Sequence, residues 1–458
     1  MNKHRPQNDY PYFNHLLRYQ KIYLCGLLML LSALSLFSNY LQEKPLLMGG
    51  ESYFYLSSGQ PDPSYQPLTL FFRVIPDQLA YLFPPLLSVG IILLFYSLAQ
   101  KINIPEKKAF LIVLFYILTP TFIFTSLALS SYSLFLLLTL CGANVLLLGT
   151  KKKYFALLPF LLASWIDTFS ALLLLGGLAV YFFPVKKSKE RFPIILLVGI
   201  AAVLVLNAAV LKSPFFLGPF TVQHKTADLI SDLGSFSGVG IFAILLAIIG
   251  LISSWQKKNV PLLLPALAVF IIAYLFNTHT VFFLSLLIVI LAAAGFVDLV
   301  EQSWSLPFLR NAALLLLLLG ISFSAVAYLD RLSGYPPTAV DQKALEWIQR
   351  NTKEETAVLS APENSYYIAY FAQRKPVFSL HQDYQHDYQL SRDIFSAFYI
   401  DELFPLLEKN KVSIIYISGE MKRQLPAQQE FLFLLQNERF KLLYFTEDAE
   451  VWSFEAKQ

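Results

Sequence analysis

The stretch Ser164-Trp165-Ile166-Asp167-Thr168-Phe169-Ser170 places a single carboxylate in the middle of an apolar run over residues 154–183. An ionisable side chain inside a membrane segment is strongly destabilising unless it reaches water, a partner or a ligand. Lysines lie at both ends of this run, and positive charge favours the cytoplasmic side. We therefore expect two short helices, 154–166 and 168–183, that enter the membrane and return, with Asp167 at the far side.

The composition indicates a membrane protein that crosses the bilayer several times. Of its 458 residues 56% are hydrophobic and only 14% are charged, which excludes an ordinary soluble protein. Both cysteines lie in apolar segments, so the sequence predicts no disulfide framework. The net charge of +4 reflects basic loops of the membrane part, and we predict no nucleic-acid partner.

Hydropathy predicts about 11 transmembrane or re-entrant helices, because each apolar segment approaches the length that spans a bilayer. Besides the two half-length helices around Asp167, the predicted segments are 22–40, 78–99, 109–129, 132–148, 192–210, 239–255, 260–276, 281–297 and 311–328.

The distribution of basic residues predicts the orientation of these segments. Alternation from a cytoplasmic N-terminus places most Lys and Arg residues inside and leaves Lys44, Arg73, Lys212 and Lys225 in outside loops. The C-terminal part then lies outside the cytoplasm. We expect a protein of the plasma membrane whose chemistry faces away from the cytoplasm.

The composition changes from apolar to mixed at Tyr335-Pro336-Pro337, which predicts a membrane domain over residues 1–334 and a soluble domain over 335–458. Helical and strand-like patterns alternate in the second part, which is typical of an α/β fold. The predicted helices are 339–351, 363–373, 401–410 and 425–436, and the predicted strands are 356–360, 375–380, 412–418, 440–446 and 450–454. The last two strands should form a hairpin.

The first outside loop carries an acidic residue in Met48-Gly49-Gly50-Glu51-Ser52-Tyr53-Phe54-Tyr55, just before a short predicted helix. Glu51 is either a functional acid or a solvated loop carboxylate that suits the positive end of that helix. Asp167 also has an alternative to a catalytic role, since Asp is a preferred N-cap for a helix beginning at Thr168. Capping and catalysis are compatible.

A lipid-linked phosphate would need positive or hydrogen-bond-donating groups near the outer membrane surface. The candidates are His279, His224 and Lys225, with Lys212 in the same loop as the last two. The alternatives are a helix cap or a snorkelling side chain at His279, and ordinary interface lysines at Lys212 and Lys225.

The order of these features resembles the GT-C glycosyltransferases, which include protein mannosyltransferases and oligosaccharyltransferase catalytic subunits. A first span is followed by an outer loop with an early acid before Tyr53 and Tyr55, then by many spans and an outward α/β domain. The resemblance implies that Glu51, where most members carry Asp, is the base or acceptor-orienting group, and that Asp167 is the second acid. It also implies that His279 contacts the lipid phosphate.

Some members with two such acids hold Mg²⁺ or Mn²⁺ between them. Glu51 and Asp167 could supply two oxygen ligands of the kind that hard cations prefer, with Asp228 or Asp232 joining them. The C-terminal part also departs from oligosaccharyltransferases. It has Ala361-Pro362-Glu363-Asn364-Ser365-Tyr366 where they carry the Trp-Trp-Asp-Tyr-Gly motif, so we do not expect transfer directed by an Asn sequon.

The leading hypothesis is a membrane glycosyltransferase that moves a sugar from a polyprenyl-phosphate or polyprenyl-diphosphate donor to an extracytoplasmic protein, lipid or glycan acceptor. The alternative is a catalytically silent scaffold of the same fold that binds lipid-linked glycan or membrane protein partners. A transporter of lipid-linked saccharides is disfavoured, because its polar residues should lie near the bilayer midplane.

Overall fold

The structure is a computed structural model that describes residues 19–57, 77–148, 152–182, 192–209, 229–235, 238–256, 263–277, 280–332, 334–378, 384–425 and 431–455. The chain divides into two compact units. The helical unit comprises Met1–Ser35 and Leu82–Ser333, and the α/β unit comprises Leu36–Tyr81 and Gly334–Gln458. The predicted domains, 1–334 and 335–458, share the boundary near residue 334 but leave residues 36–81 in the other part.

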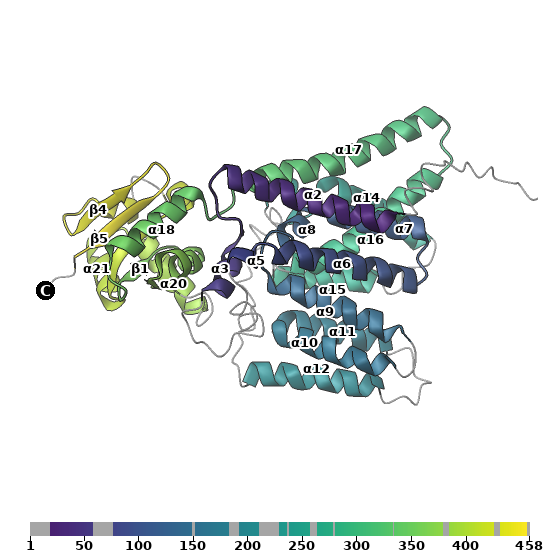
Figure 1. Cartoon of the computed structure of the whole chain (residues 1–458), viewed down its shortest axis with the longest axis horizontal. Helices are drawn as coiled ribbons and strands as arrows, with labels where there is room; N and C mark the ends of the chain where they lie inside the picture. The colour runs from purple at the N-terminus through teal and green to yellow at the C-terminus, as the bar shows by residue number, and fades with distance from the viewer. Residues whose placement is uncertain are drawn as a thin grey trace, which may run out of the picture. The chain divides into compact units, whose positions relative to one another are not determined.

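The helical unit is a bundle of apolar helices (Figure 1). Within the described residues, four helices are long and apolar enough to cross a membrane, namely α2, α6, α16 and α17. The full number of spans stays a prediction.

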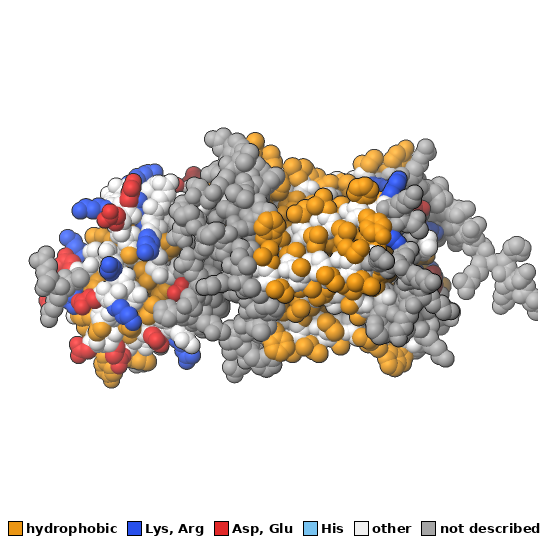
Figure 2. Space-filling view, turned by 90° about the horizontal axis from the view of Figure 1, so that it is seen from below, with side chains coloured by type: hydrophobic (Ala, Val, Ile, Leu, Met, Phe, Trp, Pro, Cys, Tyr) orange, Lys and Arg blue, Asp and Glu red, His pale blue; other side chains and the backbone are white. Residues whose placement is uncertain are grey.

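The described helices of this unit are α2 (Gln20–Leu41, which continues into the other unit), α6 (Phe83–Lys101), α7 (Glu106–Ile117), α8 (Pro120–Thr125), α9 (Ser131–Leu146), η1 (Lys152–Ala156), α10 (Leu157–Ile166), α11 (Thr168–Phe182), α12 (Phe192–Ala209), η3 (Ser231–Leu233), α14 (Ile241–Gln256), α15 (Leu263–Phe276), α16 (Val281–Glu301) and α17 (Pro307–Leu332). Figure 2 shows hydrophobic side chains covering the described face of this unit.

The predicted interruption at Asp167 is confirmed, since α10 ends at Ile166 and α11 begins at Thr168. The prediction of one continuous helix over 109–129 is wrong. There α7 ends at Ile117 and α8 begins at Pro120, with the Thr119 side chain capping α8. Proline lacks the N–H that an uninterrupted helix needs and its ring clashes with the preceding turn, so the hydropathy window joined two helices.

Two glycines let α14 and α16 approach backbone to backbone. A Cβ added to Gly250 would collide with the Leu291 carbonyl oxygen, and one added to Gly295 would lie 2.7 Å from the Gly250 nitrogen. Small residues allow this kind of close helix packing inside a membrane. The two glycines therefore set the distance between α14 and α16 in the helical unit.

The α/β unit contains a five-stranded sheet in the order β2-β1-β3-β5-β4. Strands β1 (Ala357–Leu359), β2 (Lys375–Pro376) and β3 (Val412–Ile417) are parallel, while β5 (Glu450–Phe454) runs antiparallel to both β3 and β4 (Phe440–Phe445). The predicted hairpin of β4 and β5 is confirmed. Figure 2 shows basic and acidic side chains interspersed on the described surface of this unit.

Helices cover this sheet and fix its core. The helices of the unit are α3 (Gly50–Leu56), α5 (Asp77–Ala80), α18 (Ala339–Asn351), η5 (Pro362–Asn364), α19 (Ser365–Tyr367), η6 (Ile368–Ala372), α20 (Tyr384–Phe395), α21 (Ile400–Lys409), α22 (Gly419–Gln424) and α23 (Phe431–Leu434). Apolar side chains of α20, α21 and α23 form a core with Val412, Ile415 and Ile417 of β3. Tyr416 of β3 donates to Asp341 of α18 at 2.5 Å. The predicted helix over 425–436 is confirmed at α23, whereas Leu425 is extended after the end of α22, and residues 426–430 lie outside the described residues.

We expect Gly295→Val to disrupt the α14–α16 contact, because the new side chain has no space beside the backbone of α14. Overpacking of this kind destabilises by about 1–3 kcal/mol or more. Thermal unfolding of the detergent-solubilised full chain should show a lower midpoint. Gly176→Val in α11 is the control, since a Cβ there meets nothing within 4 Å. Equal effects of the two substitutions would contradict the proposed packing.

Candidate functional site

Glu51 lies in the first turn of α3, where the sequence analysis expected a short helix. The helix follows Gly49, whose φ of 77° is in the left-handed region that favours glycine. Glu51 is half-buried, and its Oε1 accepts a hydrogen bond from the Tyr55 hydroxyl at 2.8 Å. An acid in the first turn suits the positive end of a helix, but the hydrogen bond also fixes the carboxylate, so Glu51 is not a freely solvated loop residue.

Contacts with its own loop hold α3 in place. Seven residues are too few for a stable isolated helix. The Ser52 hydroxyl donates to the Met48 carbonyl at 2.5 Å, and the Tyr53 hydroxyl donates to the Leu47 carbonyl at 2.7 Å. These two bonds close the loop back onto the helix.

An aromatic cluster docks α3 onto the C-terminal part of the same unit. The Tyr53 ring is buried and lies 5.6 Å from Tyr367, 5.1 Å from Tyr370 and 5.0 Å from Phe371, measured between ring centroids. Aromatic pairs at these separations are favourable beyond the area that they bury. The cluster makes the first loop and the C-terminal residues one packed body.

The N-terminus of α3 meets the segment that contains Glu363 and Tyr366. A Cβ on Gly50 would lie 2.7 Å from the Tyr366 ring and 3.6 Å from the Glu363 carbonyl oxygen. Only a glycine allows this approach without moving the ring. Glu51, the second residue of α3, therefore lies close to η5 and α19.

This region lies at the carboxyl ends of two neighbouring parallel strands. The chain leaves β1 toward Glu363 and leaves β3 toward Glu420. The buried Asn364 side chain joins the two segments, since its Nδ2 lies 2.9 Å from the Ser360 hydroxyl and 3.3 Å from the Ser418 hydroxyl, the N-cap of α22. The carboxyl ends of parallel strands are where open α/β sheets bind their ligands.

Several acids influence one another at this edge. Burial raises the pKa of the Tyr335 hydroxyl to about 12, with further contributions from the negative charges of Glu420 and Glu51. Burial and the charge of Glu420 raise the pKa of the Glu363 carboxyl above its ordinary value. Perturbed titratable groups cluster at functional sites more often than elsewhere. Tyr335, Glu363 and Glu420 were not predicted as site residues, although the position of both acids after predicted strands was a usable signal.

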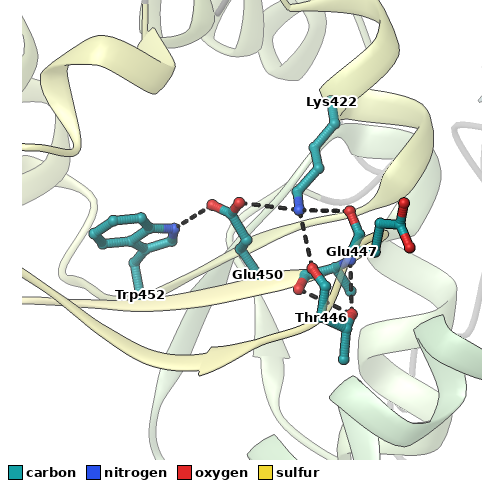
Figure 3. A network of polar contacts seen from close by, with 6 residues as sticks. Lys422, Thr446, Glu447, Glu450 and Trp452 are labelled. Atoms are coloured by element: carbon teal, nitrogen blue, oxygen red, sulfur yellow. Dashed lines mark hydrogen bonds and ion pairs between the residues drawn. The ribbon is translucent and has the colours of Figure 1, made fainter.

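A polar network holds the helix that carries Glu420. The Lys422 ammonium pairs with Glu450 at 2.9 Å and donates to the carbonyl oxygens of Thr446 at 3.2 Å and Glu447 at 3.0 Å (Figure 3). The network ties α22 to the turn between β4 and β5. Glu420 thus sits on a short helix that is anchored at both ends, by Ser418 and by Lys422.

Asp167 caps α11, as one of its two predicted roles requires. Its Oδ2 accepts a hydrogen bond from the Ser170 backbone N–H at 2.7 Å, and its side chain is half-buried. Asp167 belongs to the helical unit and Glu51 to the α/β unit. A joint role of the two acids stays a prediction.

The other predicted site residues have a structural role or lie outside the described residues. Asp232 accepts from the Ile241 N–H and the Ser324 hydroxyl, both at 2.6 Å, so it caps α14. His279, His224, Lys225, Lys212 and Asp228 lie outside the described residues. In the part of the chain that the structure describes, no group of three or more His, Cys, Asp or Glu residues could hold a metal ion. A metal between Glu51 and Asp167 stays a prediction.

Comparison with known proteins gives matches at the level of structure. No protein-family model matches the sequence, and no curated protein matches it. The fold is similar to that of an oligosaccharyltransferase from Archaeoglobus fulgidus, tethered to an acceptor peptide containing an NVT sequon, with 12% identity and a TM-score of 0.58 over 96% of this chain and 74% of that one. The same protein with Zn and sulfate gives a TM-score of 0.54 at 13% identity, over 93% of this chain and 73% of that one.

The apo form of that oligosaccharyltransferase matches over 96% of this chain and 75% of its own length, with 13% identity and a TM-score of 0.54. These matches span the helical and the α/β units alike. The resemblance to GT-C glycosyltransferases that the sequence predicted is confirmed in the fold: this chain has the fold of an archaeal oligosaccharyltransferase.

Proposed function

We propose that this chain is an integral-membrane glycosyltransferase that transfers a sugar from a polyprenyl-phosphate or polyprenyl-diphosphate donor to an extracytoplasmic acceptor. The observation that carries the proposal is the placement of Glu51. Its carboxylate is held by Tyr55 at the start of a docked helix, beside the carboxyl ends of parallel strands, in a chain with the fold of an oligosaccharyltransferase.

The proposed reaction is an inverting displacement. The Glu51 carboxylate takes the proton from the acceptor hydroxyl or amide as that group attacks C1 of the donor sugar. The bond between C1 and the phosphate oxygen breaks, and the polyprenyl phosphate leaves with the electron pair. Asp167 supports the Glu51 carboxylate in this step or binds a metal ion, and His279, with His224 and Lys225, contacts the donor phosphate.

A divalent ion would polarise the donor phosphate oxygen, with Glu51 and Asp167 as its protein ligands. The described residues supply no group of three such ligands, so no step above depends on the ion. The related oligosaccharyltransferase has been determined with Zn and sulfate and with an acceptor peptide. The different segment at 361–366 supports an acceptor other than an Asn sequon here.

Substitution of the two acids tests the proposed reaction. Purified full chain should release labelled hexose, with water as the acceptor, from a panel of synthetic polyprenyl-phosphate mannose, glucose and galactose. We expect Glu51→Gln to lower the rate by at least about a hundredfold, as for loss of a general base. Asp167→Asn should lower it by about ten- to a hundredfold, and because Asn is also a good N-cap, α11 should remain intact.

Glu43→Gln is the matched control for Glu51, because this exposed acid of the same loop pairs only with Lys343 among the described ion pairs. Asp330→Asn, at the exposed end of α17, is the control for Asp167. Turnover that is unchanged in Glu51→Gln would remove the assigned role. Absence of turnover by the wild-type protein across the panel, together with donor binding, would favour the scaffold alternative.

Glu363 gives a prediction about pH. Its pKa is raised in the folded state by burial and by Glu420, so the folded protein favours the protonated carboxyl. Stability from this group is therefore complete below its ordinary pKa and is lost as pH rises through the raised value. Glu363→Gln should be more stable than wild type at pH 8, and the difference should shrink toward pH 4.

Thermal unfolding of wild type and variant between pH 4 and pH 8 measures this difference. Glu354→Gln, an exposed acid after α18, is the control and should leave the profile unchanged. A Glu363→Gln variant that is less stable than wild type at pH 8 would show that the charged carboxylate is stabilising instead.

A further inference from the structure

One hydrogen bond links Glu51 to a residue that the sequence pattern did not assign any role. Tyr55 follows Glu51 by one helical turn, so the two side chains lie on the same face of α3. The Tyr55 hydroxyl donates to Glu51 Oε1 at 2.8 Å, and the Tyr55 side chain is 6% exposed. A buried phenol therefore contacts one specific oxygen of the proposed base.

The Tyr55 ring cannot easily move away from this contact. Its centroid lies 5.5 Å from the Phe54 ring, and Phe54 in turn packs against Tyr366 at 5.4 Å. Neighbouring Tyr53 is fixed by the aromatic cluster around Tyr367. The geometry of the phenol is thus imposed by the packing of the whole unit and not by the short helix alone.

A glutamate needs such a restraint more than an aspartate does. Its extra methylene adds a rotatable bond, and a long side chain loses more conformational entropy when it is held in one orientation. A hydrogen bond to a charged oxygen is stronger than one between neutral groups. The Tyr55 hydroxyl can therefore hold this longer acid in one rotamer.

We propose that Tyr55 is a positioning residue for Glu51: its hydroxyl fixes one carboxylate oxygen so that the carboxylate is oriented to take the proton of the acceptor. This inference rests on the proposed function. Tyr55 touches neither the donor nor the acceptor in this scheme, and acts only through the Glu51 carboxylate. Its loss should therefore lower the rate of transfer more than it changes donor affinity.

Tyr55→Phe removes the hydroxyl and keeps the ring, so α3 should remain docked. With the polyprenyl-phosphate hexose that the wild-type protein turns over, we expect kcat to fall about tenfold, as for loss of a hydrogen bond to a charged group, while the donor KM changes less than about twofold. Glu51→Asp shortens the acid and breaks the same contact, so it should lower kcat by a similar factor.

A double-mutant cycle separates positioning from general disturbance of the fold. If Tyr55 acts through Glu51, the Glu51→Asp/Tyr55→Phe double variant should be no slower than the worse single variant. The reason is that both single variants and the double variant lose the same hydrogen bond between Tyr55 and Glu51. Tyr53→Phe is the matched control. It also removes a buried phenol of α3, the one that donates to Leu47, and its effect should multiply with that of Glu51→Asp.

The outcomes distinguish failure of the positioning role from failure of the proposed function. If the effects of Tyr55→Phe and Glu51→Asp multiply, the positioning role is overturned and the proposed function stands. An increase in donor KM with unchanged kcat in Tyr55→Phe would likewise overturn the positioning role alone. Wild-type protein without turnover, or turnover that persists in Glu51→Gln, would overturn the proposed function and this inference with it.

Discussion

The packing of Tyr53 against Tyr367, Tyr370 and Phe371 is the interaction on which the candidate site depends. A seven-residue helix has no stability of its own in water. Its position is therefore decided by what its side chains bury. Because this one ring is inserted among three others, the first loop is carried by the C-terminal part of the chain, and Glu51 arrives beside residues that lie more than three hundred positions later in the sequence.

Around that docked helix, the α/β unit keeps acidic and phenolic groups at the carboxyl ends of β1 and β3. Such a concentration of acids is unfavourable for folding, because the Glu363 carboxyl loses hydration and also feels the charge of Glu420. Two uncharged restraints hold the region together, the Asn364 bridge between the strand ends and the glycine contact at Gly50. Groups that destabilise a fold while being held this firmly are typical of sites selected for function.

The sequence predicted the features that depend on local pattern. A lone Asp in an apolar run implied a helix break, and both the break and the cap at Ser170 are present. Alternation of strands and helices implied the α/β fold. The prediction of a single helix over 109–129 was wrong, because a new helix begins at Pro120 within that apolar segment. The pattern did not predict that α3 packs with the C-terminal part, because contacts between distant aromatic side chains leave no periodic signal.

The discontinuous make-up of the α/β unit has a consequence for biosynthesis. Its first piece, Leu36–Tyr81, is made long before the second, Gly334–Gln458. At roughly 5–20 residues per second, the ribosome needs on the order of tens of seconds to translate the intervening stretch. Throughout that interval the ring of Tyr53 has no partner to receive it. The docked position of α3 is therefore reached only after the last quarter of the chain has emerged.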